Sequence, residues 1–283
     1  MSHLEERMEA DLNYLRDWLW KSGDDVETAL RNAKKTLLLR DAEMAYDIIL
    51  GDHPINRDSR QCDRLCHTFI ARYLPGAGAL REMASTTRIN VILERIGDYA
   101  VTICREAVQL EAPLPEKFSA RIDGIADDAI EILSGARSAF REGNSERAIA
   151  LMGAAKRMEG HMDGLYDELF AEDDRMDATT MMVIFAVFNI FKRVADQAKN
   201  ICDQTVFAVR GVKKLPKVYR ILFIDKPGSG IGQLATAVGR SCFPETAEFT
   251  AATPGVSERV SETLNGFLIE RGLPDEELDT EQL

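Results

Sequence analysis

The sequence predicts a mainly α-helical protein, in which two pseudo-symmetric three-helix bundles are followed by a small α/β appendage at the C-terminus. Three observations lead to this prediction. Apolar residues recur with helical spacing up to residue 210, and no strand pattern interrupts them. A segment near residue 94 returns, altered, 98 residues later, which indicates a duplicated unit. After residue 211 the pattern changes to short β-branched runs separated by glycine.

The internal repeat relates residues 94–108 to residues 192–206. Arg, Asp, Ala, Ile, Cys and Val recur in register between the two segments without a gap. Both segments have one continuous apolar helical face. In the first copy Glu94 and Asp98 fall on the opposite face, four residues apart and therefore one above the other. The second copy keeps the aspartate but has a lysine in place of the glutamate.

The first bundle is predicted to occupy residues 1–112. Its first helix is interrupted at Gly23, where Ser22 or Asp24 can cap a new start, so we expect one long, kinked helix. The proline at position 54 predicts the next break, because proline interrupts a helical pattern. The predicted helices cover residues 4–50, 55–73 and 80–110.

The second bundle is predicted to occupy residues 113–210. Pro113 and Pro115 separate it from the first bundle, and Gly143 with Asn144 predicts a hairpin turn between its first two helices. The predicted helices cover residues 118–142, 145–170 and 178–209.

A basic linker at residues 211–218 leads to the predicted α/β tail, residues 219–283, which carries a net charge of -6. A sheet of two strands leaves unpaired edges and is marginal alone, so we expect the tail to pair with a second chain and the protein to be a homodimer. The predicted elements are a strand at 219–224, a helix ending near 241, a strand at 247–251 and a helix at 256–271.

The composition excludes several classes of partner. A formal charge of -12 and a pI near 5.0 argue against nucleic acid and anionic membranes, since both require a basic face. No basic segment followed by an apolar one opens the chain, and its longest apolar run, residues 181–191, is too short to span a bilayer. We therefore expect a cytoplasmic protein.

The cysteines predict buried free thiols. The chain has five, and Cys104 and Cys202 lie on the apolar sides of the repeated helices. Cys62 and Cys66 share a helical face, but His67 points about 100° away and no further pair completes a tetrahedral zinc site.

The stretches RDAEMAYDIILGDHPIN and PGAGALREMASTTRINVILERIGDYAVTI resemble the phosphate-uptake regulator (PhoU) family, and the likeness covers about residues 1–210. The resemblance implies two three-helix bundles and a non-enzymatic regulator of phosphate uptake and phosphate-responsive signalling. It implies contacts with the phosphate transporter ATPase, with a sensor histidine kinase, or with both, so that the protein meets the membrane only through protein partners.

The resemblance also implies metal on paired helix carboxylates, with one pair on the second helix and one on the third helix of each bundle. Divalent or ferric ions fit such sites, and the residues do not distinguish iron, zinc, nickel, magnesium or calcium. The lysine at position 192 cannot be a ligand, so we expect the second site to bind metal poorly. The pairs are Asp52 with Asn56, Glu94 with Asp98, Glu159 with Asp163, and Lys192 with Asp196.

The tail resembles the first half of the low-molecular-weight phosphotyrosine phosphatase and arsenate reductase fold. In that fold the phosphate loop begins with a cysteine and carries an arginine six positions later, where this chain has Asp225 and Ile231. A carboxylate repels the anion and isoleucine donates no hydrogen bond, so we expect a catalytically dead relic. The backbone of its turn, made of Gly228, Ser229, Gly230 and Gly232, is a candidate anion site, although a plain tight turn is the simpler interpretation.

Two other functions remain open at this point. A metal-dependent or phosphatase-like enzyme would need a water-activating metal and a set of phosphate-binding arginine or lysine residues in one cleft. A scaffold that acts only through its partner surface would need no metal.

Overall fold

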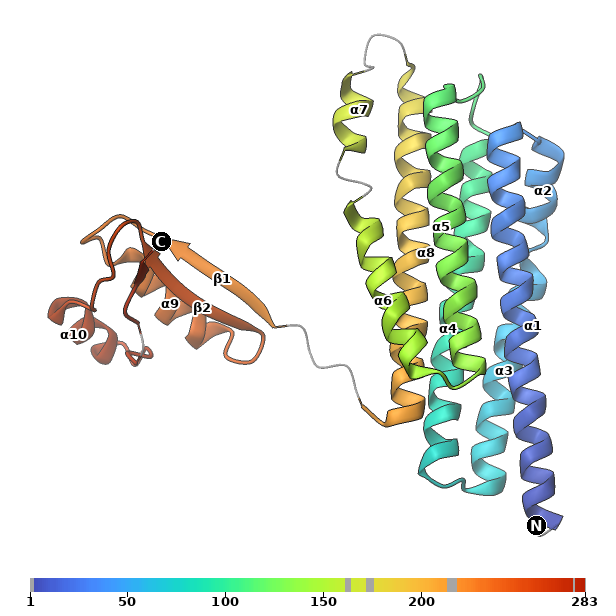
Figure 1. Ribbon diagram of the computed structural model, residues 1–283, viewed down its shortest axis with the longest axis horizontal. Helices are drawn as coiled ribbons and strands as arrows, with labels where there is room; N and C mark the ends of the chain where they lie inside the picture. Colours follow the sequence, from blue (N-terminus) through green and yellow to red (C-terminus); the bar gives the residue numbers. More distant parts are fainter. Residues whose placement is uncertain (1–2, 161–163, 172–175, 213–217, 277, 283) are drawn as a thin grey trace. The chain divides into compact units, whose positions relative to one another are not determined.

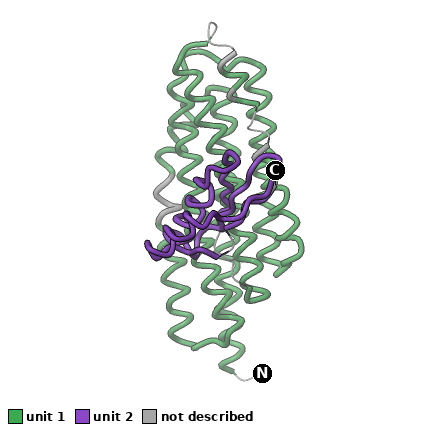
Figure 2. Tube along the Cα trace, turned by 90° about the vertical axis from the view of Figure 1, so that its left-hand side faces the viewer, with its two compact units in different colours: residues 1–213 green, residues 214–283 purple. Residues whose placement is uncertain are grey.

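The computed structural model describes residues 3–160, 164–171, 176–212, 218–276 and 278–282 (Figure 1). The chain divides into two compact units, Met1–Lys213 and Lys214–Leu283, which Figure 2 draws in different colours. Each unit is considered by itself below.

Unit 1 is helical, as the sequence predicts. Its described residues contain no strand. The helices, labelled in Figure 1, are α1 (His3–Leu39), α2 (Ala42–Leu50), α3 (Asp52–Tyr73), α4 (Ala77–Ala107), α5 (Glu116–Arg141), α6 (Ser145–Gly160), α7 (Leu165–Ala171) and α8 (Ala178–Arg210).

The two repeated segments lie in α4 and α8, which pack against each other. Helices α1 and α3 also contact α4, while α5 and α6 contact α8. The buried side chains of both halves form one continuous core, which includes Ile96 and Ile103 of α4 and Val194 and Ile201 of α8. Within the part of the chain that the structure describes, the core therefore has no boundary between residues 112 and 113, and the division of unit 1 into two bundles there stays a prediction from the repeat.

Helix α8 is long and apolar enough to cross a bilayer by length and composition alone. Half of the most apolar stretch of this helix is buried inside the unit, however, as is typical of the core helix of a globular protein. Residues such as Val187 and Phe188 supply this buried surface.

The predicted interruption of the first helix at Gly23 is wrong. Helix α1 continues through this position and ends at Leu39. The break comes at Arg40, which has a φ of 55°, and at Asp41, whose side chain accepts a hydrogen bond from the backbone nitrogen of Met44 at 3.0 Å. Asp41 is therefore the N-cap of α2.

Two other helix boundaries differ from the prediction. Helix α3 begins at Asp52, so Pro54 lies in its first turn, where the missing backbone N–H has no helical partner to lose. The single helix predicted at 145–170 is divided into α6 and α7, with residues 161–163 outside the described part of the chain. The predicted turn at Gly143 is confirmed by its φ of 63°.

Unit 2 consists of β1 (Tyr219–Ile224), α9 (Ile231–Cys242), β2 (Ala247–Thr253), α10 (Glu262–Glu270) and β3 (Glu281–Gln282). Its strands form a parallel sheet with the order β1-β2-β3. Within the sheet, the ring of Phe249 on β2 stacks on that of Phe223 on β1, with the ring centroids 6.1 Å apart. Helix α9 packs over Phe249, and a Cβ at Gly239 would lie 2.6 Å from the Phe249 ring. Glycine at position 239 thus lets α9 approach the sheet closely.

The last predicted helix is too long at its start, and the third strand was not predicted. The backbone N–H of Glu258 donates to the Oγ1 of Thr280 at 2.8 Å, and the backbone N–H of Thr280 donates to the carbonyl of Glu258 at 2.8 Å. These bonds hold the segment before α10 in an extended form beside the C-terminus. Ser261 then caps α10 by accepting from the backbone nitrogen of Leu264.

Candidate functional site

The carboxylates of the first repeat lie on α4, on the side that borders α3. Glu94 is half-buried, and its Oε2 accepts a hydrogen bond from the Oγ of Ser59 at 3.4 Å. The buried Asn90, one turn earlier, donates to the carbonyl of Ser59 at 2.9 Å and to the Oδ1 of Asp63 at 3.2 Å. This polar network holds Glu94 toward α3, while Asp98 is exposed.

The antiparallel course of α3 and α4 bears on the predicted first metal site. Ser59 is level with Glu94, so residues nearer the start of α3 are level with residues nearer the end of α4, where Asp98 lies. The positions of Asp52 and Asn56 on α3 fit this level, but their side chains lie outside the described part of the structure.

The second repeat places Lys192 and Asp196 on α8, both half-buried. Among the side chains that the structure describes, no carboxylate lies within ion-pair distance of Lys192. Helix α6 packs against α8, but the side chains of Glu159 and Asp163, the other predicted ligands, lie outside the described residues.

Metal binding is therefore still a prediction in both halves. The described residues contain no group of three His, Cys, Asp or Glu side chains able to hold a metal ion. The side chains of four of the seven predicted ligands lie outside the described part of the structure, namely those of Asp52, Asn56, Glu159 and Asp163.

The prediction of buried free thiols is confirmed for four of the five cysteines. Cys62, Cys66, Cys104 and Cys202 are free and buried, whereas Cys242 is exposed. Burial raises the pKa of Cys104 to about 11 and that of Cys202 to about 12, because a thiolate loses its solvation in an apolar core. The neighbouring imidazole at position 67 is exposed, so it does not share a site with the buried thiols.

The glycine-rich turn of unit 2 has its backbone donors bound by carboxylates of the same unit. The Oδ2 of Asp225 accepts from the backbone nitrogen of Gly232 at 2.8 Å, and its Oδ1 accepts from that of Lys226 at 2.7 Å. Both carboxylate oxygens of Glu258 accept from the backbone nitrogen of Gly228, at 2.8 and 2.9 Å. An anion would therefore be repelled by Asp225, and it would also find the backbone N–H groups of Gly228 and Gly232 already bound to carboxylates.

These hydrogen bonds also set the charge state of Asp225. The bond from the Gly232 backbone, followed by those from neighbouring residues of the turn, lowers the pKa of its carboxyl group. Asp225 therefore stays ionised and caps the start of α9. Ser229, Gly230 and Ile231 line an adjacent cavity of about 480 Å³ together with Glu258.

A buried arginine joins the two halves of unit 1, and sequence reasoning missed it. Arg137 of α5 reaches α1, where its side chain is only 5% exposed. It donates to the carbonyl of Trp20 at 2.9 Å, pairs with Glu27 at 2.7 Å, and also binds Asp24. A Cβ at Gly23 would lie 2.7 Å from the Cζ of Arg137, so this glycine provides room for the guanidinium. A glycine inside a strong helical pattern was the signal available in the sequence.

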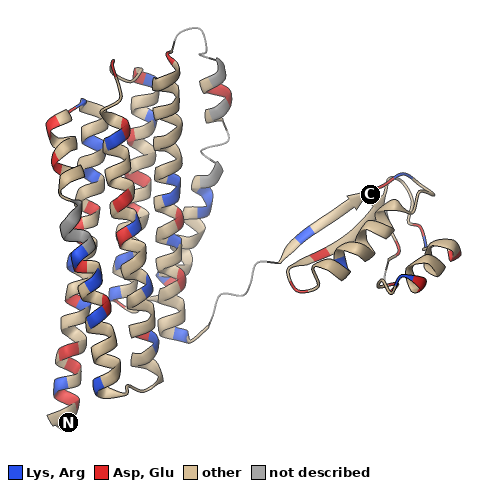
Figure 3. Cartoon of the chain, turned by 180° about the vertical axis from the view of Figure 1, so that it is seen from behind, with Lys and Arg blue, Asp and Glu red and all other residues tan. Residues whose placement is uncertain are grey.

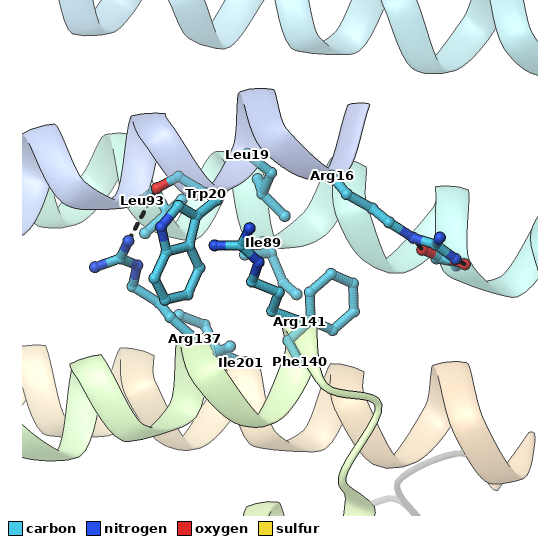
Figure 4. Close-up of a pocket in the computed structure, with 10 residues that line it drawn as sticks. Arg16, Leu19, Trp20, Ile89, Leu93, Arg137, Phe140, Arg141 and Ile201 are labelled. Carbon is cyan, nitrogen blue, oxygen red and sulfur yellow. Dashed lines mark hydrogen bonds and ion pairs between the residues drawn. The ribbon is translucent and has the colours of Figure 1, made fainter. Parts of the chain in front are cut away.

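Next to Arg137 lies a small cavity of about 30 Å³ that is lined by residues of α1, α4, α5 and α8 (Figure 4). The Trp20 ring lies between two guanidinium groups, that of Arg137 at 4.6 Å and that of Arg141 at 4.5 Å from the ring centroid. Phe140 and Arg16 also line this cavity. The space is sufficient for about one water molecule.

Comparison with known proteins finds relatives of the helical unit. The family model described as "PhoU domain" matches residues 19–107. The chain is 26% identical over 212 residues to the "Phosphate-specific transport system accessory protein PhoU" of Escherichia coli (strain K12), covering 74% of this chain and 88% of that protein. It is 29% identical over 214 residues to the homolog from Pseudomonas putida, covering 74% of this chain and 83% of that protein.

Solved structures agree with the sequence matches. The crystal structure of PhoU from Pseudomonas aeruginosa superposes with a TM-score of 0.68 at 26% identity, over 72% of this chain and 99% of that one. The phosphate transport system regulatory protein PhoU from Streptococcus pneumoniae has the same fold, with a TM-score of 0.68 at 24% identity over 74% of this chain and 99% of that one. The helical unit of this chain is therefore similar to PhoU proteins in sequence and in fold, and its residues 19–107 match the PhoU domain.

Proposed function

We propose that this chain is a non-enzymatic accessory protein that regulates phosphate uptake and phosphate-responsive signalling. One observation carries the proposal: the similarity to accessory proteins of phosphate transport systems extends over both halves of the helical unit and most of each relative's length. We place the protein in the cytoplasm, where it contacts the transporter ATPase, a sensor histidine kinase, or both.

The surface of unit 1 is compatible with protein partners. Figure 3 shows acidic and basic positions interspersed along its helices. Nucleic acid would instead require a concentration of basic residues on one face. The formal charge of -12 opposes binding to anionic lipid, so membrane association is expected only through the protein partners.

A metal role for the first half is part of the proposal. Glu94 and Asp98 are one turn apart on α4, and the bond from Ser59 turns Glu94 toward the helix on which the other predicted pair lies. Two carboxylates four residues apart repel each other by about 0.2–0.5 kcal/mol, and a shared divalent or ferric cation removes this repulsion. The second half, with Lys192, is proposed to bind metal poorly.

The alternative, a phosphatase-like enzyme, gains no support from unit 2. The position of the expected thiolate is held by Asp225, whose oxygens are bound to backbone N–H groups, and Ile231 replaces the expected arginine.

We propose instead that unit 2 mediates homodimerisation. Strand β1 is at the edge of the sheet, and its residues Tyr219, Leu222 and Ile224 are exposed.

The regulatory proposal is tested in the organism that encodes the chain. Deletion of the gene should change phosphate uptake in phosphate-rich medium, and a plasmid copy should restore it. Unchanged uptake after deletion would contradict the proposal. Dimerisation is tested separately by light scattering on the full chain and on residues 1–211. We expect the full chain to be a dimer and the truncated chain to have a lower oligomeric state. An unchanged oligomeric state after truncation argues against dimerisation through unit 2.

A further inference from the structure

A groove of about 680 Å³ opens at the end of unit 1 where α8 finishes. Its walls come from α1, α4, α5 and α8, so both halves of the unit contribute. It lies next to the small cavity of Figure 4 and shares Arg16, Glu82, Phe140 and Arg141 with it. Nothing in the proposed regulatory role accounts for this groove.

The charges that line the groove are not all paired within it. Arg16 binds both oxygens of Glu82, at 2.7 and 2.9 Å, so these two charges satisfy each other. Glu142 pairs with Arg147 at 3.3 Å. After these pairs, the guanidinium groups of two further arginines are left facing the groove, in a chain whose formal charge is -12.

The first of these is Arg81 of α4. Its Nε donates to the carbonyl of Ala208 at 3.3 Å, near the last turn of α8. No carboxylate among the described side chains lies within ion-pair distance of it. The hydrogen bond from Nε fixes the direction of the side chain and leaves the terminal N–H groups available to a ligand.

The second is Arg141 of α5. Its guanidinium stacks on Trp20, which is itself held on the other side by Arg137 (Figure 4). Stacking uses the face of the guanidinium and leaves its N–H edge available. Among the described side chains, the carboxylate that pairs with it is Asp17, at 3.5 Å. The Asp17 side chain is 74% exposed, and such a pair contributes little.

We propose that this groove binds a phosphoryl oxyanion through Arg81 from one half of the unit and Arg141 from the other. A pre-oriented guanidinium edge matches two oxygens of a phosphoryl group, and two arginines that line one groove supply positive charge from two different helices. The volume admits either inorganic phosphate or a phosphate monoester whose organic part packs on Phe140. This binding is measured on the purified chain, so it can be tested without the phosphate-uptake experiment that tests the regulatory role.

The test is calorimetric titration of the full-length protein at low ionic strength, with inorganic phosphate in one arm and adenosine monophosphate in the other. Saturable binding is expected in at least one arm. Similar affinities identify the phosphoryl group alone as the ligand, and an affinity at least about tenfold higher for the nucleotide identifies a monoester. Absence of saturable binding of both probes at millimolar concentrations would overturn the proposal.

Three substitutions assign the site. Arg81→Gln and Arg141→Gln should each weaken binding by about ten- to a hundredfold, the range expected for the loss of a charged hydrogen-bond donor. Asp17→Asn should tighten binding, because it removes a negative charge that lines the groove and repels an anion. This gain keeps the test decisive even where an arginine variant loses structure.

The matched control is Arg64→Gln. Arg64 is exposed on α3 and, like Arg81, donates from its Nε to a backbone carbonyl at 3.3 Å, but it does not line the groove. It should leave the affinity unchanged. An equal loss of affinity in this control, or unchanged affinity in both Arg81→Gln and Arg141→Gln, would contradict the assignment.

Discussion

Helices α4 and α8 carry the two copies of the repeat, and they differ in chemical character mainly on their polar sides. Their buried faces are equivalent: Ile96, Ala100 and Ile103 are fully buried, as are their counterparts Val194, Ala198 and Ile201. Their polar faces differ, since a glutamate bound to α3 in one copy corresponds to a lysine in the other. Packing has therefore kept the two halves alike, while the chemistry of the outer side has been free to change.

The largest expected effect concerns the contact between the halves. Gly23→Ala places a Cβ where the guanidinium of Arg137 passes, which displaces this buried charge from Glu27 and Trp20. Breaking a buried ion pair costs about 3–5 kcal/mol, so urea unfolding followed by the helical circular dichroism signal should show a loss of this size. Gly124→Ala on α5, whose Cβ would meet nothing within 4 Å, should instead be neutral or stabilise by up to about 1 kcal/mol. Equal effects of the two substitutions would show that Gly23 is not needed for the arginine.

The next effect tests whether the two buried faces are equivalent. Ile103→Ala in α4 and Ile201→Ala in α8 should each lower the free energy of unfolding by about 2–5 kcal/mol, because both side chains are fully buried in the shared core. Ile149→Ala on α6, where the side chain is 46% exposed, should change it by about 0.5 kcal/mol or less. A large loss in one copy and none in the other would mean that the halves do not contribute alike to the core.

The cysteines of the repeat give a smaller, pH-dependent effect. The pKa values of Cys104 and Cys202, about 11 and about 12, lie above the ordinary value of 9.0, so the folded state retains their protons more strongly than the unfolded state does. The stability that they contribute is present below pH 9 and is lost as the pH rises toward these values. Unfolding free energies measured from pH 8 to 11 should fall, and the slope should be shallower in Cys202→Ala.

Thiol labelling provides the companion measurement. In the folded chain a thiol reagent at pH 8 should modify Cys242, the exposed cysteine, and leave the four buried ones unmodified until the protein unfolds. Rapid labelling of Cys104 in the folded protein, with Cys202 protected, would contradict the equivalence of the two buried faces.

The sequence predicts this molecule well where a pattern is local. The helical periodicity and the repeat place α4 and α8, and the strand at Tyr219–Ile224 has the predicted bounds, because alternation, turns and caps act over a few residues. Gly23 was misinterpreted as an interruption because its reason lies in Arg137, a residue of the other half that approaches only after folding.

The candidate sites were harder to predict for the same reason. The spacing of Glu94 and Asp98 is visible in the sequence, but the bond from Ser59 that orients the glutamate depends on how α3 packs on α4. The carboxylate of Asp225 was expected to repel an anion, yet local pattern does not reveal that it binds the backbone of Gly232 seven residues later. Tertiary placement decides both cases.

Metal analysis of the full-length protein, purified without a metal-affinity tag, tests the central asymmetry between α4 and α8 most directly. We expect Asp98→Asn to remove most of the bound metal, Asp196→Asn to leave the content unchanged, and Lys192→Glu to raise it, because the lysine ammonium is then replaced by a ligand. Asp98 is the better probe than Glu94, since it is exposed and its loss leaves the bond between Ser59 and Glu94 intact. Equal losses of metal in Asp98→Asn and Asp196→Asn, or an unchanged content in Lys192→Glu, would contradict the account.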